Sequence, residues 1–422
     1  MTNYTTETYQ TKRDILNFSK KISEGLKKST KKFNSDMIYG ILSSHSCLIS
    51  EVTRSLKEKT KDAYVNDRLS TKLMSLNDEE INIIENNYYK NVMEYLPDDY
   101  VIVLNDDTDI NKEYSNKLED LCYVRDASSQ VERIVSGYKV CEYVALSKNE
   151  KQPISLYSKL YSTVSKNFIS ENIETINGEE KVIKVLNEYN RKPIFIRDRG
   201  YDSNEYFKKD IKEDNKFVTR LVGTRKLLFK DKLRNVLEVA AERKGKIVTK
   251  LIKKGENEEC SISYTRVKLP AYKSKEVSLV TIYGLSEEPM LLLTNLEVKD
   301  KESAEYIVRL YFLRWRIEEY FKTKKSYNWE NSLVRSINSM NNLNKLLTYC
   351  MFYLTTIIEK LDTSFYSNIV LERAKSLKEK FIVYLSIMSR GIKEILKYAR
   401  TGIKEWQNIE TREKVKQLQL KL

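Results

Sequence analysis

The sequence predicts a mixed α/β protein in which a sheet-forming centre is flanked by helical regions. Three observations support this fold class. Residues 12–72 carry the apolar period of amphipathic helices. The centre of the chain consists of short β-branched or aromatic runs, first three together and then alternating with helical segments. After about residue 297 the pattern becomes helical again. Strands that alternate with helices are typical of a mixed sheet.

The first region, residues 1–98, is predicted to be a helical DNA-binding region. Residues 12–72 contain 14 Lys or Arg against 7 Asp or Glu. A solvated helical surface and a contact with DNA both account for this excess. Residues 76–99 are acidic and end in the turn-forming sequence Pro97-Asp98-Asp99, so we place a domain boundary there.

The first part of the sheet-forming core is predicted at residues 99–222. Three strands come first, and then a helix at about 179–190, a strand, a helix from Ser203 and a last strand. The strand sequences are YVIVLND (100–106), YKVCEYVAL (138–146), PISLYSKLY (153–161), KPIFIRD (192–198) and KFVTRLV (216–222).

Residues 223–296 are predicted to form a β-rich insertion, with runs such as CSISYTRVKL and VSLVTIYGL. Residues 220–275 hold 16 Lys or Arg against 6 Asp or Glu, a local charge of +10. This concentration favours contact with DNA phosphates, and Arg220, Arg225 and Lys226 are candidate contacts. Residues 297–340 then carry a core helix, and residues 341–422 form a helical C-terminal region.

The amino-acid composition favours some classes of function and argues against others. The net charge of +14 suits a polyanionic partner such as nucleic acid. Five cysteines without CxxC spacing and a single histidine, His45, argue against zinc ligation and against a histidine-based triad. The dispersed cysteines fit a reducing cytosol. Because no apolar run approaches the roughly 20 residues of a membrane span, we expect a soluble, cytoplasmic protein without a membrane partner.

The segment YFLRWRIEEYFKTKK, at residues 311–325, combines an apolar face with a charged stripe. At about 100° per residue, Tyr311, Glu318 and Lys325 fall within about 60° of Arg314 on a helix. Taken alone, such a stripe is better explained as an ordinary surface Arg–Glu pair, worth about 0.2–0.5 kcal/mol. A functional reading therefore depends on partners elsewhere in the chain.

Two aspartates provide such partners. Asp106 closes the predicted strand YVIVLND, and Asp198 closes KPIFIRD. Each aspartate alone is also a common turn former. Together with Glu318 they form a set of three carboxylates, which is stable only around cations because clustered like charges otherwise raise each other's pKa. Ligation by oxygen alone favours Mg²⁺ or Mn²⁺, and two such ions about 3.5–4 Å apart support in-line displacement at phosphorus.

These motifs resemble those of a known family. The order DDT at 106–108, DRGYDS at 198–203 and then Tyr311, Arg314, Glu318 and Lys325 at their spacing is similar to bacterial insertion-sequence transposases of the DDE type. It most resembles the cut-and-paste group with the Tyr-Arg-Glu-Lys signature, over about residues 100–340. The resemblance implies a ribonuclease H-like catalytic core interrupted by the β-rich insertion.

The resemblance also implies roles for individual residues. Asp106, Asp198 and Glu318 become the catalytic, metal-binding triad; Arg314 and Lys325 become phosphate ligands, and Tyr311 a packing or phosphate-contacting neighbour. Asp107 is an alternative to Asp106, and Asp202 an alternative to Asp198. Some relatives have a tryptophan before LLLT that stacks on a flipped base, where this chain has Met290. Trp315 or Trp329 could replace it, although a tryptophan beside an apolar face more often belongs to the core.

The implied activity is that of a transposase. It would bind the terminal inverted repeats of its element, cleave the DNA ends and join the 3′-hydroxyls to target DNA with two Mg²⁺ or Mn²⁺ ions. Two protomers would act together, as a homodimer, because two DNA ends must meet in one complex. Two alternatives remain: a structure-selective nuclease of the same fold, and a non-catalytic DNA-binding descendant of a transposase.

Overall fold

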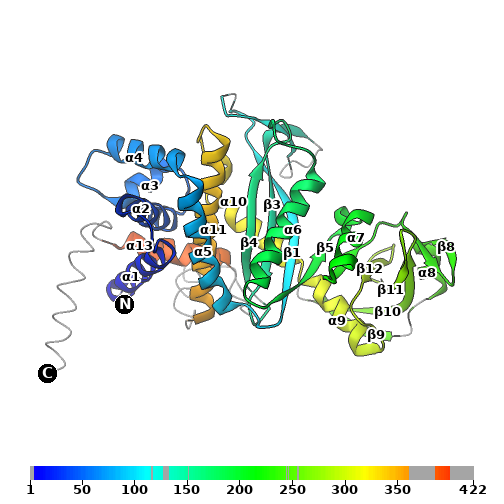
Figure 1. The fold of residues 1–422 in the computed structure, drawn as a ribbon. Helices are drawn as coiled ribbons and strands as arrows, with labels where there is room; N and C mark the ends of the chain where they lie inside the picture. The colour runs from blue at the N-terminus through cyan, green and yellow to red at the C-terminus, as the bar shows by residue number, and fades with distance from the viewer. Residues whose placement is uncertain are drawn as a thin grey trace, which may run out of the picture.

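The computed structural model describes residues 4–360 and 385–399, apart from residues 116, 127–132, 151, 244, 246, 254 and 255. Its described part is elongated, with a helical lobe at one end, a sheet with helices on both faces in the middle, and a β-rich region at the other end (Figure 1). The predicted C-terminal helical region, residues 341–422, lies partly outside the described residues.

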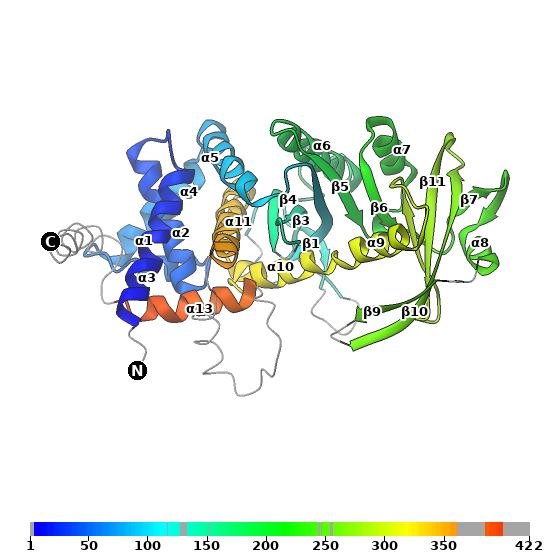
Figure 2. The same cartoon turned by 90° about the horizontal axis from the view of Figure 1, so that it is seen from below.

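The helical lobe joins the two ends of the chain. Its N-terminal helices are α1 (Tyr4–Ile22), α2 (Lys28–Ser44), α3 (Ile49–Leu56), α4 (Asp62–Ser75) and α5 (Asp78–Val92), followed by the turn η1 (Met93–Tyr95). Helix α11 (Ile337–Lys360) packs against α2 and α4, and α13 (Leu385–Lys397) packs against α1 and α2. The predicted N-terminal region therefore shares its core with C-terminal helices and is not a separate body (Figure 2).

The central sheet starts with an antiparallel meander and continues with parallel strands. Strand β3 (Ile134–Leu146) lies between β1 (Tyr100–Asn111) and β4 (Pro153–Tyr161), antiparallel to both, and β2 (Cys122–Arg125) pairs with its first residues. On the other side of β1, β5 (Lys192–Arg197) and β6 (Lys216–Arg220) run parallel to it. Four of the five strands predicted here agree closely with the structure. Strand β4 has the predicted limits, β5 and β6 end one or two residues early, and β3 begins a few residues early. Strand β1 differs more.

Strand β1 continues five residues past its predicted end at Asp106. Its parallel pairing with β5 stops at Leu104 opposite Ile196, whereas its antiparallel pairing with β3 continues to Asn111 opposite Gly137. The polar residues after Leu104 therefore keep a strand conformation because β3 still pairs with them. The expectation that Asp106 closes its strand is wrong; it lies inside β1, just beyond the end of its β5 partner.

Helices cover both faces of this sheet. Helices α6 (Glu171–Asn187) and α7 (Asn204–Glu213) lie on one face, and α10 (Trp315–Lys325) crosses the other (Figure 2). The packing under α6 is tight, as the Tyr143 hydroxyl of β3 donates a 2.8 Å hydrogen bond to the Thr175 carbonyl of α6. Ser203 caps α7 as predicted, whereas α6 begins at Glu171, earlier than the expected residue 179.

The β-rich insertion extends the central sheet. Its elements are β7 (Lys226–Phe229), β8 (Lys232–Asn235), α8 (Val236–Glu242), β9 (Ile247–Lys253), β10 (Glu256–Leu269), β11 (Tyr272–Tyr283) and β12 (Met290–Thr294). Strand β12 pairs with β6, for example Leu293 opposite Thr219, so a 12-stranded sheet runs through both regions. This pairing covers the edge of β6, whose unpaired backbone groups would otherwise be exposed.

The predicted helix over residues 311–325 is two helices in line. Helix α9 (Lys301–Phe312) ends just before Arg314, and α10 starts at Trp315 (Figure 2). Tight i→i+3 hydrogen bonds join them, including Arg314 N to Tyr311 O at 3.0 Å and Ile317 N to Arg314 O at 3.1 Å. Because Arg314 keeps helical angles (φ −52°, ψ −32°), its side chain still lies above the first turn of α10.

Candidate functional site

The candidate site lies where β1 and β5 stop running side by side. Leu104 and Ile196 form the last parallel pair, and Asp106 and Asp198 each follow two residues later. The carboxyl ends of parallel strands are a common place for ligands to bind in α/β sheets. The two aspartates are close enough that the charge of Asp198 affects the ionisation of Asp106.

Arg314 joins Asp106 to Glu318. Its Nη1 atom lies 3.2 Å from Oδ2 of Asp106, and its Nη2 atom lies 2.5 Å from Oε1 of Glu318. One guanidinium at the α9–α10 junction therefore holds a carboxylate from the sheet and a carboxylate from the helix. The structure thus brings Asp106, Arg314 and Glu318 together and places Asp198 near Asp106.

The ionisation of Asp106 is perturbed by its surroundings. Burial raises its pKa to about 7; the Arg314 guanidinium opposes this shift, and the Asp198 carboxylate adds to it. Such a carboxyl is stable in its charged form only when a cation is near. Asp198 is half-buried and caps the start of the turn η2 (Arg199–Tyr201). Its Oδ1 atom accepts a 2.7 Å hydrogen bond from the backbone N–H of Gly200.

Asp107, the alternative to Asp106, lies on the other face of β1. Cys141 and Tyr201 lie next to its carboxyl, and burial raises its pKa to about 6. Successive side chains of a strand alternate between the two faces, so only one of the adjacent aspartates can face Arg314. That residue is Asp106.

Asp202, the alternative to Asp198, has a structural role together with Arg225. Its carboxylate accepts hydrogen bonds from the Val222 backbone N–H at 2.8 Å and from Arg225 Nε at 2.7 Å. Arg225 also donates to the Asp202 carbonyl and to Oδ1 of Asn204. Arg225, predicted as a DNA contact, therefore uses its guanidinium within the protein to fix the loop after β6.

The other predicted DNA contacts differ in exposure. Lys226 is exposed at the start of β7, and Arg220 is half-buried at the end of β6. Lys325 lies 3.1 Å from Glu330 of the turn η3 (Trp329–Asn331), with 28% of its side chain exposed. Tyr311 is 6% exposed, in the last turn of α9, and its backbone carbonyl accepts a hydrogen bond from the Arg314 backbone N–H. This burial gives Tyr311 a packing position beside Arg314.

Two of the tryptophans have opposite environments. Trp329 is fully buried, as expected of a core residue, whereas Trp315 is 60% exposed at the first position of α10, next to Arg314. Met290, at the position where relatives have the stacking tryptophan, is half-buried and starts β12. Trp315 is thus an exposed aromatic residue next in the chain to Arg314.

Sequence reasoning missed Lys324 and Glu142, which fix α10 to the sheet. Both side chains are fully buried, and Lys324 Nζ lies 2.9 Å from Oε2 of Glu142. Glu142 stands opposite Asp106 in the β1–β3 register, so it shares the face that α10 covers. The position of Lys324 on the apolar side of the helical wheel was the signal that could have identified it.

The donor set around Arg314 fits a divalent cation. Within the described ranges, no three His, Cys, Asp or Glu side chains are already placed around one metal position. However, Asp106 and Glu318 both direct oxygens at a single cationic group, the Arg314 guanidinium, and Asp198 lies near Asp106. Carboxylate oxygens without nitrogen or sulfur ligands are the donors that Mg²⁺ and Mn²⁺ prefer.

Two further features concern the cysteines and the helices of the described residues. All five cysteines are buried, and none forms a disulfide bond. None of the described helices combines the length and apolar composition needed to cross a lipid bilayer.

Comparison with known proteins gives a match to a family model over part of the chain. Residues 161–353 match the family model described as the transposase DDE domain. The matched stretch, just under half of the chain, contains Asp198, Arg314 and Glu318, while Asp106 lies before it. No curated protein matches the chain. Members of the DDE transposase family usually use divalent metal ions. The match supports a DDE-type transposase.

Proposed function

We propose that this protein is a cut-and-paste transposase that binds the terminal inverted repeats of an insertion sequence, cleaves the DNA ends and joins the 3′-hydroxyls to target DNA. The main support is the bridge that Arg314 makes between Asp106 and Glu318, beside Asp198. The strand order β4-β3-β1-β5-β6, with three antiparallel strands followed by two parallel ones, fits the proposed ribonuclease H-like core.

In this proposal Asp106, Asp198 and Glu318 hold two Mg²⁺ or Mn²⁺ ions. Such ions, when bound, activate the attacking oxygen and stabilise the leaving oxygen at phosphorus. Asp106 and Asp198 provide ligands from adjacent strands, and Glu318 provides one from a helix fixed by the buried Lys324. Arg314, and Lys325 at the other end of α10, bind phosphates next to the cleaved bond.

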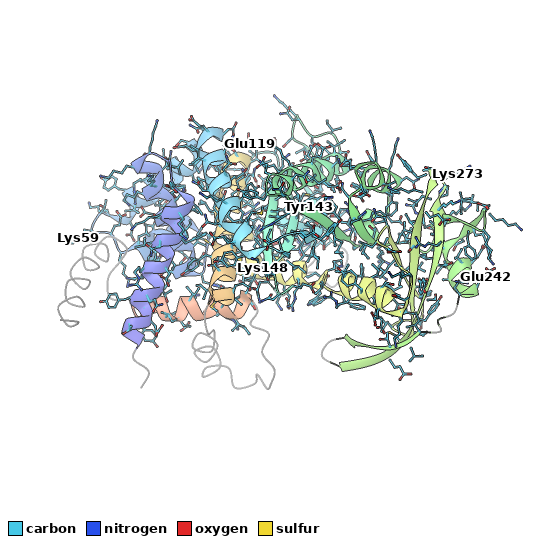
Figure 3. All side chains as sticks on the ribbon, turned by 60° about the horizontal axis from the view of Figure 1, so that its bottom comes forward. Lys59, Glu119, Tyr143, Lys148, Glu242 and Lys273 are labelled. Atoms are coloured by element: carbon cyan, nitrogen blue, oxygen red, sulfur yellow. The ribbon has the colours of Figure 1, made fainter. Side chains whose placement is uncertain are left out.

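Two basic regions would grip the DNA on either side of the site. Lys59, in the basic N-terminal region, and Lys273, in the insertion, lie towards opposite ends of the long axis (Figure 3). Exposed lysines at both ends bind a duplex through its phosphates. Two protomers would pair the two DNA ends, and the proposed contact through the C-terminal helices falls largely outside the described residues.

The test is end cleavage and strand joining by Glu318→Gln beside wild type, with Mg²⁺ and DNA carrying the terminus of the element. Glu319→Gln is the matched control, because Glu319 is the next residue on α10 and contacts Arg316, with Nη1 to Oε2 at 2.8 Å. We expect wild type and Glu319→Gln to cleave and join, and Glu318→Gln to bind the same DNA without either reaction.

Other outcomes separate the alternatives. Cleavage without joining by wild type would indicate a structure-selective nuclease. Tight DNA binding by all three proteins without cleavage would indicate a non-catalytic descendant. Equal cleavage by Glu318→Gln and wild type would remove Glu318 from the active site.

A further inference from the structure

Arg314 occupies the place in the site where positive charge is needed. Its two terminal nitrogens are divided between two carboxylates, Asp106 at 3.2 Å and Glu318 at 2.5 Å. These residues are 208 and 4 positions away in the chain, so the bridge forms only when α10 lies on the sheet. The guanidinium therefore neutralises oxygens that the proposed function assigns to metal ions.

The contacts of Arg314 with Asp106 and Glu318 are partly exposed to solvent, so other ions can replace them. The Arg314, Asp106 and Glu318 side chains are 19%, 24% and 37% exposed. Ion pairs that reach solvent are weak, because water and dissolved ions screen them. The Lys324–Glu142 pair, further along α10, is completely buried by contrast. Helix α10 thus has one permanent attachment to the sheet and one that solvent, an ion or a phosphate can reach.

The position of Arg314 in the backbone also suits movement. It lies at the junction of α9 and α10, where i→i+3 hydrogen bonds replace the regular helical pattern. Its planar fork binds a phosphate with the same geometry that it uses for carboxylates. Release from Asp106 and Glu318 would leave the fork available for DNA close to the same carboxylates.

We propose that Arg314 is an internal substitute for the metal ions: it holds Asp106 and Glu318 while the site is without ions, and it must leave them for a divalent cation to bind. This inference rests on the proposed function and adds a positioning role to Arg314. Metal binding and phosphate binding by Arg314 then support each other, because the step that frees the carboxylates also frees the guanidinium.

The experiment measures Mn²⁺ binding by electron paramagnetic resonance, with the full chain and without DNA. We expect Arg314→Gln to bind Mn²⁺ about 5- to 30-fold more tightly than wild type, the factor that corresponds to losing one or two competing ion pairs that reach solvent. Arg316→Gln is the matched control, because Arg316 contacts Glu319 on the same helix, and its affinity should equal that of wild type.

Arg314→Lys separates bridging from simple charge repulsion. Lysine keeps the charge but lacks the planar fork that reaches two carboxylates. If Arg314 acts by bridging, Arg314→Lys binds Mn²⁺ more tightly than wild type. Wild-type affinity in Arg314→Lys, with tight binding in Arg314→Gln, would mean that charge alone opposes the ion and would overturn the proposal.

A second readout and a second variant keep the result interpretable. Mg²⁺ should raise the melting temperature of Arg314→Gln more than that of wild type, because a ligand stabilises the state that binds it more tightly. Adding Glu318→Gln to Arg314→Gln should remove the gain in Mn²⁺ affinity.

If Arg314→Gln and wild type bind Mn²⁺ equally and both depend on Glu318, the substitute role fails while the proposed metal site stands. If no variant binds Mn²⁺ and wild type neither cleaves nor joins DNA, the proposed function itself fails.

Discussion

Lys324 and Glu142 form a completely buried ion pair that attaches α10 to β3. The Lys324 ammonium contacts the Glu142 carboxylate at 2.9 Å and also donates hydrogen bonds to Asn344 and Thr348 of α11. Burial lowers the pKa of Lys324, and Glu142 counteracts this shift. The pair therefore fixes one end of the helix whose other end carries Glu318.

We expect Lys324→Met to lower the free energy of unfolding by about 3–5 kcal/mol, because it leaves the Glu142 carboxylate buried without its cation. Glu142→Gln combined with Lys324→Met should recover part of this loss. Lys325→Met is the adjacent control; its ion pair is partly exposed, so its effect should stay below about 1 kcal/mol. Urea unfolding followed by circular dichroism measures all three, and equal effects at the two lysines would contradict the assignment.

The helical wheel already separates these two lysines. At about 100° per residue, Lys324 lies about 280° from Arg314, on the apolar face, whereas Lys325 lies at about 20°. The same wheel places Trp315 at about 100°, away from the apolar face, which agrees with its exposure. These positions depend on local geometry alone, and the short turn at Leu313–Arg314 is too small to disturb them.

Relationships between distant segments could not be predicted in this way. The strand sequences indicate that β1, β5 and β12 exist, but the pairing of β12 with β6 is a contact between residues more than 70 positions apart. The Asp202–Arg225 contact is of the same kind, and it takes a predicted DNA contact into the protein. Charge in the sequence shows which residues can bind phosphates, and only the packed structure shows which are already engaged.

The choice between Asp106 and Asp107 predicts a difference between two isosteric variants. Asp106→Asn should abolish DNA cleavage, by more than about 100-fold, because it removes a ligand from the proposed metal site. Asp107→Asn should retain cleavage within a few fold, since Asp107 faces Cys141 and Tyr201. Single-turnover cleavage of DNA carrying the element terminus distinguishes them. Loss of activity only in Asp107→Asn would reverse the assignment.

We expect substitution by alanine to affect protein stability at Trp329 and DNA binding at Trp315. Trp329→Ala should cost about 3–5 kcal/mol of stability because it empties a fully buried position. Trp315→Ala should leave stability nearly unchanged and weaken binding of the DNA end by about 1–3 kcal/mol, the range for one stacked base. Fluorescence of 2-aminopurine at the terminal nucleotides reports the stacking. Unchanged fluorescence in Trp315→Ala would remove this role.

We expect substitutions of Lys226 and of Arg225 to affect the salt dependence of DNA binding differently. Lys226→Gln should weaken DNA binding and reduce the slope of log affinity against log salt concentration by about 1, as expected for one lost phosphate contact. Arg225→Gln should keep the wild-type slope and lower thermal stability, because its guanidinium holds Asp202 and Asn204. Fluorescence anisotropy over a salt series measures both, and a reduced slope in Arg225→Gln would show that this side chain also reaches DNA.

His45, the sole histidine of the chain, links the helical lobe to the core, and we expect acid to weaken this contact. Its Nε2 lies 3.2 Å from the Ser326 hydroxyl after α10, its Nδ1 lies 2.8 Å from the Ser389 hydroxyl of α13, and its ring packs on Tyr327. Burial lowers its pKa to about 4, and Lys393 and Arg390 of α13 add to this shift.

The sign of the pH effect follows from this lowered pKa. Between about pH 6.5 and pH 4 the unfolded chain binds a proton at this imidazole and the folded chain does not. The contribution of His45 to stability is therefore complete above about pH 6.5 and decreases, by up to about 3 kcal/mol, as the pH falls to about 4. His45→Asn suits the left-handed backbone at this position (φ 54°) and should lack this component of the pH dependence. Because there is only one histidine, its imidazole gives a single NMR signal in histidine-labelled protein, and titration of that signal near pH 6.5 would contradict the buried, neutral ring.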